Sequence, residues 1–249
     1  MAHAPPLLLL PGLMNDGRVW MPVRGAFQPA DRDLVVARTD LHDHVTAIAA
    51  AAISLMPAGR FAVAGFSLGG YVALEVCRQA PERIAGLALL DTGARADTPE
   101  SAENRHRMIA ALDRGQASFA EIAGSFAPRL LHASHVSDPD LIGLLGDMAR
   151  NVGAEGFKRQ QTAAMSRPDN REVLRGVHAP ALVLCGAEDK VTPPELSDEM
   201  AGLLPGEVER VAVATAGHMS TLEQPAAVTT ALARWLQRVD AATASSGTR

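Results

Sequence analysis

The sequence predicts an α/β fold with a mostly parallel sheet, helices on both faces and an inserted helical segment. Short apolar runs alternate with helical patterns before residue 93 and again after residue 176, which is typical of strands joined by crossover helices. Between these two regions the patterns are helical, with no convincing strand. The 249 residues, 47% of them hydrophobic, are enough to bury a substantial core in one domain that carries an insertion.

The individual elements follow from the length and period of the apolar runs. Short runs bounded by turn residues predict strands, and longer periodic segments predict helices. We expect a core in two parts, residues 1–93 and 177–239, a helical insertion over 94–176 and a disordered tail over 240–249. The expected strands cover residues 7–10, 33–38, 61–66, 84–90, 181–185 and 208–213. One helix is expected directly after residue 67. The other expected helices cover residues 45–56, 102–114, 118–131, 140–151, 154–166, 194–204 and 226–239.

Composition excludes several classes of partner. The formal net charge is −5, with no basic stripe, so nucleic acid is not an expected partner. The apolar run near the N-terminus is too short for a signal peptide or a membrane span, so we expect a soluble, cytoplasmic protein with no membrane contact. Cys77 and Cys185 fall in a predicted helix and at a predicted strand end, where reduced core thiols are expected. The oligomeric state stays unknown at this stage.

A G-x-S-x-G motif joins an apolar strand to a helix rich in small residues. Gly65, Ser67 and Gly69 occupy its fixed positions. A sharp turn from strand to helix strains the residue at its apex and raises that side chain above the sheet edge, and the glycines make room for the turn. The helix N-terminus beside it favours developing negative charge. We therefore predict Ser67 as a nucleophile, the alternative being an ordinary turn serine.

A serine nucleophile needs a base and an acid that orients the base. Two later loops offer these groups, each directly after a predicted strand: residues 186–193 contain Asp189, and residues 215–220 contain His218. Because the carboxyl ends of parallel strands meet at one edge of a sheet, we expect both side chains near Ser67. Asp91 also ends a strand, so it remains an alternative acid or a structural loop residue.

These motifs resemble the α/β-hydrolase superfamily, in particular its esterase and enol-lactonase-like branch with a helical cap. GFSLGG resembles the family's nucleophile elbow, GAEDKVTP its acid loop and AGHMSTLEQP its histidine loop, in the family's order and over nearly the whole chain. The resemblance implies an α/β-hydrolase fold and a catalytic triad of Ser67, Asp189 and His218, with Asp189 preferred to Glu188. It also implies that residues 94–176 form the cap.

The family's oxyanion hole is made of two backbone N–H groups. By resemblance they belong to Leu68, directly after the nucleophile, and to Leu13, in the loop after the first strand. In relatives that loop reads H-G-x, whereas here it reads Pro11-Gly12-Leu13. Since the donor is backbone, the hole can persist, but other residues must support the loop.

The resemblance implies a cofactor-independent serine hydrolase that cleaves a small carboxylic ester or lactone through an acyl-enzyme. A thioester, a C–C bond, perhydrolysis or a lyase reaction can use the same triad, and a low-turnover ligand-binding protein is a further alternative. No cofactor or metal is expected: the DLHDH cluster at 40–44 is better explained as a solvated loop than as a metal site. We expect some cap residues to line an apolar acyl pocket. Three arginines of the insertion either bind a substrate carboxylate or are solvated: Arg129, Arg150 and Arg159.

Overall fold

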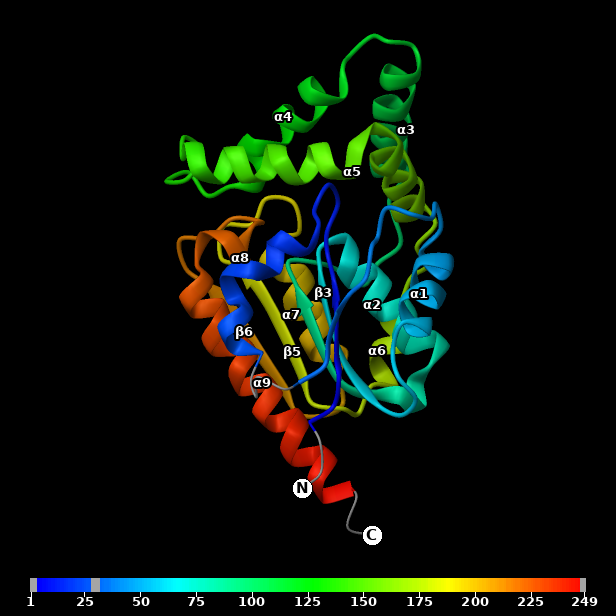
Figure 1. Cartoon of the computed structure of the whole chain (residues 1–249), viewed down its shortest axis with the longest axis vertical. Coiled ribbons are helices and arrows are strands. Elements are labelled where there is room, and N and C mark those ends of the chain that lie inside the picture. Colours follow the sequence, from blue (N-terminus) through cyan, green and yellow to red (C-terminus); the bar gives the residue numbers. More distant parts are fainter. Residues whose placement is uncertain (1–3, 28–31, 247–249) are drawn as a thin grey trace.

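The computed structural model describes residues 4–27 and 32–246. Among these residues, six strands form one sheet in the order β2-β1-β3-β4-β5-β6, with each neighbouring pair parallel (Figure 1). The predicted α/β class and parallel sheet are therefore confirmed. The strands are β1 (Leu7–Leu10), β2 (Leu34–Val36), β3 (Phe61–Phe66), β4 (Ile84–Leu90), β5 (Ala181–Gly186) and β6 (Val208–Val213).

Helices connect the strands, and most begin within three residues of their predicted positions. In the described part of the chain, the segment between β4 and β5 contains helices and no strand, as expected. The helices are η1 (Gly17–Ala26), α1 (Val45–Ser54), α2 (Leu68–Gln79), η2 (Pro81–Arg83), α3 (Pro99–Asp113), α4 (Phe119–Leu130), α5 (Pro139–Met165), α6 (Arg171–Arg175), α7 (Pro194–Leu203), α8 (Ser220–Glu223) and α9 (Pro225–Ser246).

The central strands are apolar at every position because both faces of the sheet are covered. Successive side chains of β1 point to opposite faces: Leu7 and Leu9 pack with η1, α8 and α9, while Leu8 and Leu10 pack with α1, α2, α6 and α7. The core thus lies in two layers, one on each side of the sheet. This burial fixes the strand register and holds the carboxyl ends of the strands along one edge.

The helices α3, α4 and α5 lie beyond that edge, in green at the top of Figure 1. They share a small apolar cluster that includes Ile122 and Phe157 and also packs against Met14 of the loop after β1. Gly153 has φ 72° and ψ 170°, which kinks α5 between the two helices expected there. The last residues of the expected insertion do not lie with α3, α4 and α5. Instead, α6 contacts α2 and α7, and its Leu174 is buried in the core on that side of the sheet.

Two expected boundaries are wrong. The last helix does not end at residue 239: α9 continues to Ser246, so residues 240–246 of the expected disordered tail are helical, and 247–249 lie outside the described residues. Asp240, the first residue of this segment, is not simply solvated: its carboxylate pairs with the buried Arg32 guanidinium at 2.7 Å. The strand expected over 33–38 shortens to β2 because it is a sheet edge, where Leu34 and Val36 are exposed.

Two further features concern the expectations drawn from composition. Cys77 and Cys185 are both buried and free, as predicted for core thiols. Burial raises the pKa of the Cys77 thiol to about 12, which keeps it protonated and unreactive at neutral pH. Across residues 4–27 and 32–246, no helix combines the length and the apolar character required to cross a bilayer.

Candidate active site

Ser67 stands at the turn from β3 into α2 with strained backbone. Its φ of 52° and ψ of −116° are unusual for a residue with a Cβ, so surrounding contacts must hold it. The Ser67 N–H donates to the Leu90 carbonyl at 2.9 Å, and the Thr92 hydroxyl donates to the Ser67 carbonyl at 2.8 Å. The strained elbow predicted from the motif is present, and Thr92 is a support that the motif did not reveal.

The two motif glycines allow the backbone to approach closely. A Cβ on Gly65 would overlap the backbone of Gly69, and a Cβ on Gly69 would overlap the Leu10 carbonyl. Both contacts involve backbone atoms, which cannot move aside as a flexible side chain can. The first turn of α2 therefore rests directly on the ends of β1 and β3 only because these positions lack side chains.

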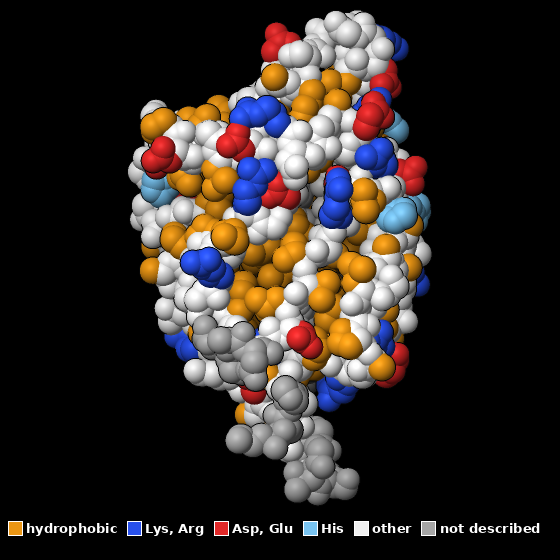
Figure 2. Space-filling model, in the orientation of Figure 1, with side chains coloured by type: hydrophobic (Ala, Val, Ile, Leu, Met, Phe, Trp, Pro, Cys, Tyr) orange, Lys and Arg blue, Asp and Glu red, His pale blue; other side chains and the backbone are white. Residues whose placement is uncertain are grey.

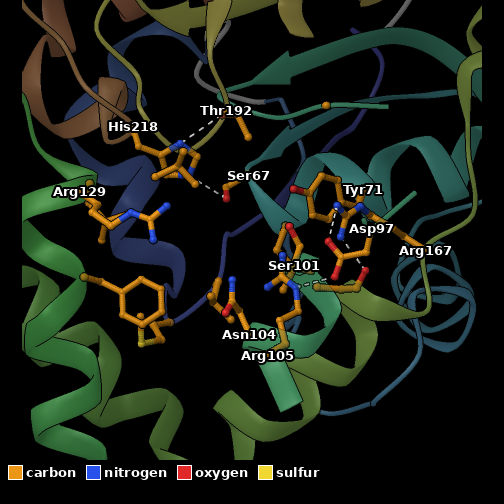
Figure 3. Close-up of a pocket in the computed structure, with 18 of the residues that line it drawn as sticks. Ser67, Tyr71, Asp97, Ser101, Asn104, Arg105, Arg129, Arg167, Thr192 and His218 are labelled. Carbon is orange, nitrogen blue, oxygen red and sulfur yellow. Dashed lines mark hydrogen bonds and ion pairs between the residues drawn. The ribbon is translucent and has the colours of Figure 1, made fainter. Parts of the chain in front are cut away.

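The structure brings the three predicted catalytic side chains into one hydrogen-bonded chain, of which Figure 3 shows the link between Ser67 and His218. The Ser67 Oγ lies 2.9 Å from His218 Nε2, and His218 Nδ1 lies 2.8 Å from Asp189 Oδ2. They follow β3, β6 and β5, respectively. Because these strands are parallel, loops far apart in the sequence meet at the same sheet edge.

Asp189 is buried, yet its surroundings favour the carboxylate. Its Oδ1 accepts the N–H groups of Val191 at 2.7 Å and Thr192 at 3.0 Å, and its Oδ2 accepts the Thr192 hydroxyl at 2.7 Å. Burial raises the pKa of Asp189, but the adjacent His218 and these hydrogen bonds outweigh that effect and hold the pKa below its usual value. Asp189 is therefore an ionised acceptor for the imidazole.

His218 is also buried, and its carboxylate partner determines its tautomer. Burial lowers the pKa of His218, but the charge and hydrogen bond of Asp189 outweigh burial, so the pKa is raised above its usual value. An ionised carboxylate can only accept, so in the neutral imidazole Nδ1 carries the proton. Nε2 is then free to accept the Ser67 hydroxyl proton, which is the geometry required of a general base.

Asp91 lies close by but makes different contacts. Its Oδ1 accepts the Gly186 N–H at 2.8 Å, and its Oδ2 accepts the Ser220 hydroxyl. Burial, followed by the charge of Asp189, raises the pKa of Asp91 well above its usual value. Within the described part of the chain His218 is hydrogen-bonded to Asp189 and not to Asp91. Asp91 therefore joins the ends of β4 and β5 to the histidine loop.

The two predicted oxyanion donors, the backbone N–H groups of Leu13 and Leu68, belong to residues that line the same cavity as Ser67. No described residue accepts a hydrogen bond from either N–H. The loop that carries Leu13 is held by the buried Gln160 of α5, whose Oε1 accepts the Met14 N–H at 2.9 Å and whose Nε2 donates to the Thr39 hydroxyl at 3.0 Å. Gln160 thus supplies support for the loop that contains Pro11.

Glu223 ties the histidine loop to the segment after α4. One carboxylate oxygen accepts the Gly217 N–H at 2.9 Å, and the other accepts the His132 N–H at 2.6 Å and lies 3.0 Å from His135 Nδ1. The Leu130 carbonyl accepts the His218 N–H at 2.7 Å. The sequence showed Glu223 only as part of a motif, without indicating that it joins two segments.

A cavity of about 400 Å³ opens beside Ser67 and His218. Met108 of α3 and Phe126 of α4 line it, as do Leu13, Leu130 and Met219, so part of its wall is apolar. Part of the helical segment between β4 and β5 therefore forms part of the wall of the cavity beside Ser67.

The remaining candidate residues have other partners. Of the three arginines considered from the sequence, Arg129 lines the cavity, whereas Arg150 pairs with Asp147 and Arg159 donates to the Asp40 carbonyl at 2.7 Å. In the DLHDH cluster, the Asp40 carboxylate pairs with Arg38 and the His44 side chain caps the N-terminus of α1.

Comparison with known proteins finds esterases among the proteins that this chain resembles. A pimeloyl-[acyl-carrier protein] methyl ester esterase of Neisseria meningitidis is 28% identical over 150 residues, which are 58% of this chain and 57% of that relative. The match therefore spans little more than half of the relative's length. A thermophilic esterase from Thermogutta terrifontis, solved with malate bound, is 31% identical with a TM-score of 0.84, covering 96% of this chain and 92% of that chain.

An enol-lactonase from Burkholderia xenovorans LB400 shares the fold, with a TM-score of 0.80 at 23% identity over 95% of this chain and 92% of that chain. The sequence model of the alpha/beta hydrolase fold family matches residues 29–225. That match covers well over half of the chain and includes the elbow, the acid loop and the histidine loop. This protein belongs to the α/β-hydrolase family.

Proposed function

We propose that the protein is a serine hydrolase that cleaves a small carboxylic ester or lactone through an acyl-enzyme, without a cofactor. The observation that carries this proposal is the chain of hydrogen bonds from Ser67 through His218 to Asp189. A hydroxyl on a strained elbow, a buried imidazole and an ionised carboxylate in this order are the groups that acyl transfer requires.

The proposed reaction has two steps. His218 Nε2 takes the Ser67 proton as Oγ attacks the acyl carbon, and it then gives the proton to the departing alcohol oxygen. The acyl group is left on Oγ. A water molecule, deprotonated by the same Nε2, attacks the acyl carbon and releases the acid, and the proton returns to Ser67. Asp189 stabilises the imidazolium that forms in both steps and holds its Nδ1 tautomer.

We assign the oxyanion hole to the backbone N–H groups of Leu13 and Leu68, because both lack an acceptor among the described residues and both residues line the cavity. Loss of one such donor lowers kcat by about 10²- to 10³-fold in comparable sites. We further propose that residues 94–176 serve as the cap, with α3 and α4 providing the apolar acyl wall. The esterases and the enol-lactonase among the relatives support an ester or lactone substrate.

The acyl-enzyme can be tested by measuring how it partitions between methanol and water as acyl acceptors. Ethyl, phenyl and p-nitrophenyl esters of one small acid are hydrolysed in the presence of methanol, and the ratio of methyl ester to free acid is measured. A shared acyl-enzyme has lost the leaving group, so the ratio is expected to be the same for all three esters. A ratio that depends on the leaving group would contradict the mechanism, and Ser67→Ala protein serves as the blank for uncatalysed methanolysis.

The pH dependence follows from the state of His218. Only the neutral imidazole can accept the Ser67 proton, and the pKa of His218 is raised above its ordinary value of about 6.5. We therefore expect kcat/KM to reach its maximum above the raised pKa of His218 and to fall about tenfold per pH unit below it. The measurement is kcat/KM for an ester with a non-titrating leaving group from about pH 5 to 9. A profile that stays flat across this range would exclude His218 as the base.

A further inference from the structure

The charges that line the cavity differ in sign from those of the whole chain. The formal net charge of the protein is −5, and basic and acidic side chains are interspersed on the face shown in Figure 2. The cavity beside Ser67 is lined by one acidic side chain, Asp97, and by four arginines. These arginines are Arg95, Arg105, Arg129 and Arg167.

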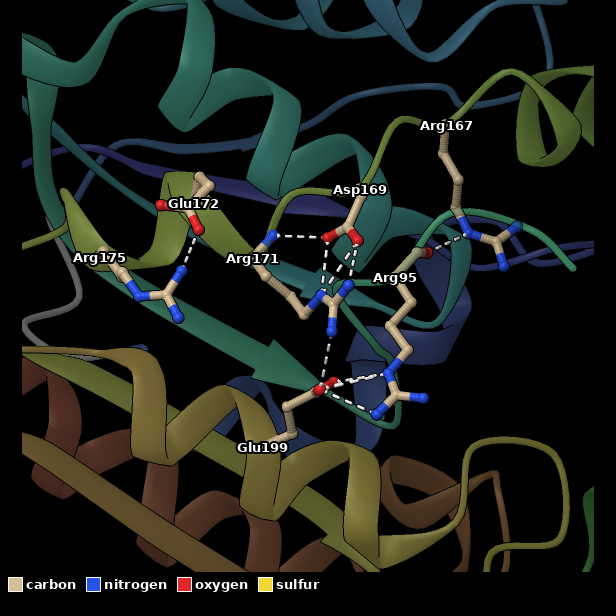
Figure 4. A network of polar contacts seen from close by, with 7 residues as sticks. All are labelled: Arg95, Arg167, Asp169, Arg171, Glu172, Arg175 and Glu199. Carbon is tan, nitrogen blue, oxygen red and sulfur yellow. Dashed lines mark hydrogen bonds and ion pairs between the residues drawn. The ribbon is translucent and has the colours of Figure 1, made fainter.

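Three of the four arginines form ion pairs with carboxylates. Arg105 and Arg167 both pair with Asp97, at 2.9 and 2.8 Å. Arg95 pairs with Glu199 at 2.9 Å, in a network that Glu199 shares with Arg171 (Figure 4). These guanidinium groups are already engaged, so they have little capacity left to bind a ligand.

Arg129 is different. No residue in 4–27 or 32–246 supplies it with a hydrogen bond or an ion pair, and Figure 3 shows its guanidinium pointing into the cavity that Ser67 and His218 also face. An arginine in such a place presents a fork of N–H donors whose geometry matches a carboxylate. Among the described residues, Arg129 is therefore the one arginine of the cavity wall without a partner, and it faces the cavity beside Ser67.

The position of Arg129 is fixed with respect to the triad. It lies in the last turn of α4, and the next residue, Leu130, accepts the His218 N–H at 2.7 Å. Two residues further on, the His132 N–H donates to Glu223 at 2.6 Å. Since the backbone on the C-terminal side of Arg129 is tied to the histidine loop, the Cα of Arg129 keeps a defined place beside the triad.

We infer that Arg129 binds a carboxylate of the substrate, so that the preferred substrate carries an ionised acid group besides the ester or lactone bond. A half-ester of an aliphatic dicarboxylic acid is the simplest such molecule. One unpaired guanidinium matches one negative charge, and the apolar Met108 and Phe126 of the same wall suit the methylene chain between the two ends. This inference rests on the proposed hydrolase function and specifies its substrate class.

The test compares an anionic ester with a neutral ester of the same shape. The probes are the monomethyl esters of succinic to suberic acid and the corresponding esters in which the free acid is a carboxamide. The quantity measured is the ratio of kcat/KM for acid over amide, in wild type, Arg129→Gln and Arg114→Gln. Arg114 is a matched control because, like Arg129, it lies at the C-terminal end of a helix between β4 and β5 and is exposed. It has no ion pair within the described residues and does not line the cavity.

Wild type is expected to prefer the acid, and Arg129→Gln is expected to lower the ratio by about 10- to 100-fold, as the loss of a charge-assisted contact predicts. Added salt should lower the ratio in wild type more than in Arg129→Gln, and Arg114→Gln should keep the wild-type ratio. If wild type cleaves the esters but shows no preference for the acid, or if Arg129→Gln keeps the preference, the carboxylate site is wrong while the hydrolase function stands. If wild type cleaves none of these esters and also fails with the neutral aryl esters, the hydrolase function and this inference both fail.

Discussion

Replacing Ser67 with alanine is expected to lower kcat/KM for ester hydrolysis by about 10⁴-fold or more, because the change removes the only atom that forms the acyl bond in the proposed mechanism. The melting temperature should stay close to the wild-type value. The substitution removes one hydroxyl that opens onto a cavity and leaves the backbone contacts of the elbow to Leu90 and Thr92 in place. Steady-state kinetics and thermal denaturation measure the two effects.

A suitable control is Ser54→Ala, since Ser54 lies on α1 and its hydroxyl bonds only to the Ala51 carbonyl among the described residues. This variant should hydrolyse esters at the wild-type rate. If Ser67→Ala keeps a substantial fraction of the activity while folded, Ser67 is not the nucleophile.

The second large effect is expected for Asp189→Asn, at about 10⁴-fold in kcat. An amide at this position can donate to Nδ1 and so favour the tautomer that has its proton on Nε2, facing Ser67. It also removes the charge that raises the pKa of His218, so the remaining activity should persist to lower pH than in wild type. The rate and the acid limb of the pH profile are measured together, which separates loss of charge from general damage to the fold.

Asp91→Asn is the matched comparison for Asp189→Asn. The pKa of Asp91 is raised well above its usual value by burial and by the charge of Asp189, so its neutral form is favoured and an amide resembles it. We therefore expect a far smaller loss of rate than for Asp189→Asn. Should Asp91→Asn prove the more damaging of the two, the orienting acid would be Asp91 and the assignment of Asp189 would be wrong.

The sequence predicted the buried part of the fold well because burial on both faces leaves a clear pattern. Each of β1, β3, β4 and β5 is a continuous apolar run bounded by turn residues, and their predicted limits agree with the structure to within one residue. The prediction was wrong where a polar residue was taken to mark the end of a helix. Asp240 looked like the start of a solvated tail, but its partner Arg32 lies over 200 positions away, and no local pattern reveals such a pair.

The candidate site was predictable to the extent that its residues lie in short motifs at strand ends. Ser67, Asp189 and His218 each follow a strand, and a parallel sheet places such ends together. The supporting residues were not predictable, because they lie in no such motif. Gln160 resembles any polar residue in a helix, and nothing in the sequence separates Arg129 from the other two candidates, Arg150 and Arg159. Only the packing of α4 and α5 against the loops shows which side chains face inward. Long-range contacts of this kind leave no periodicity in the sequence.

The most direct test of the account is the mass of the intact protein after treatment with a fluorophosphonate, in wild type and in Ser67→Ala. An activated serine displaces fluoride and retains the phosphonyl group, so the account predicts one adduct on wild type and none on the variant. An adduct of equal yield on both proteins would place the reactive nucleophile at another residue. No adduct on wild type would mean that Ser67 is not activated by His218 and Asp189, which would contradict the central claim.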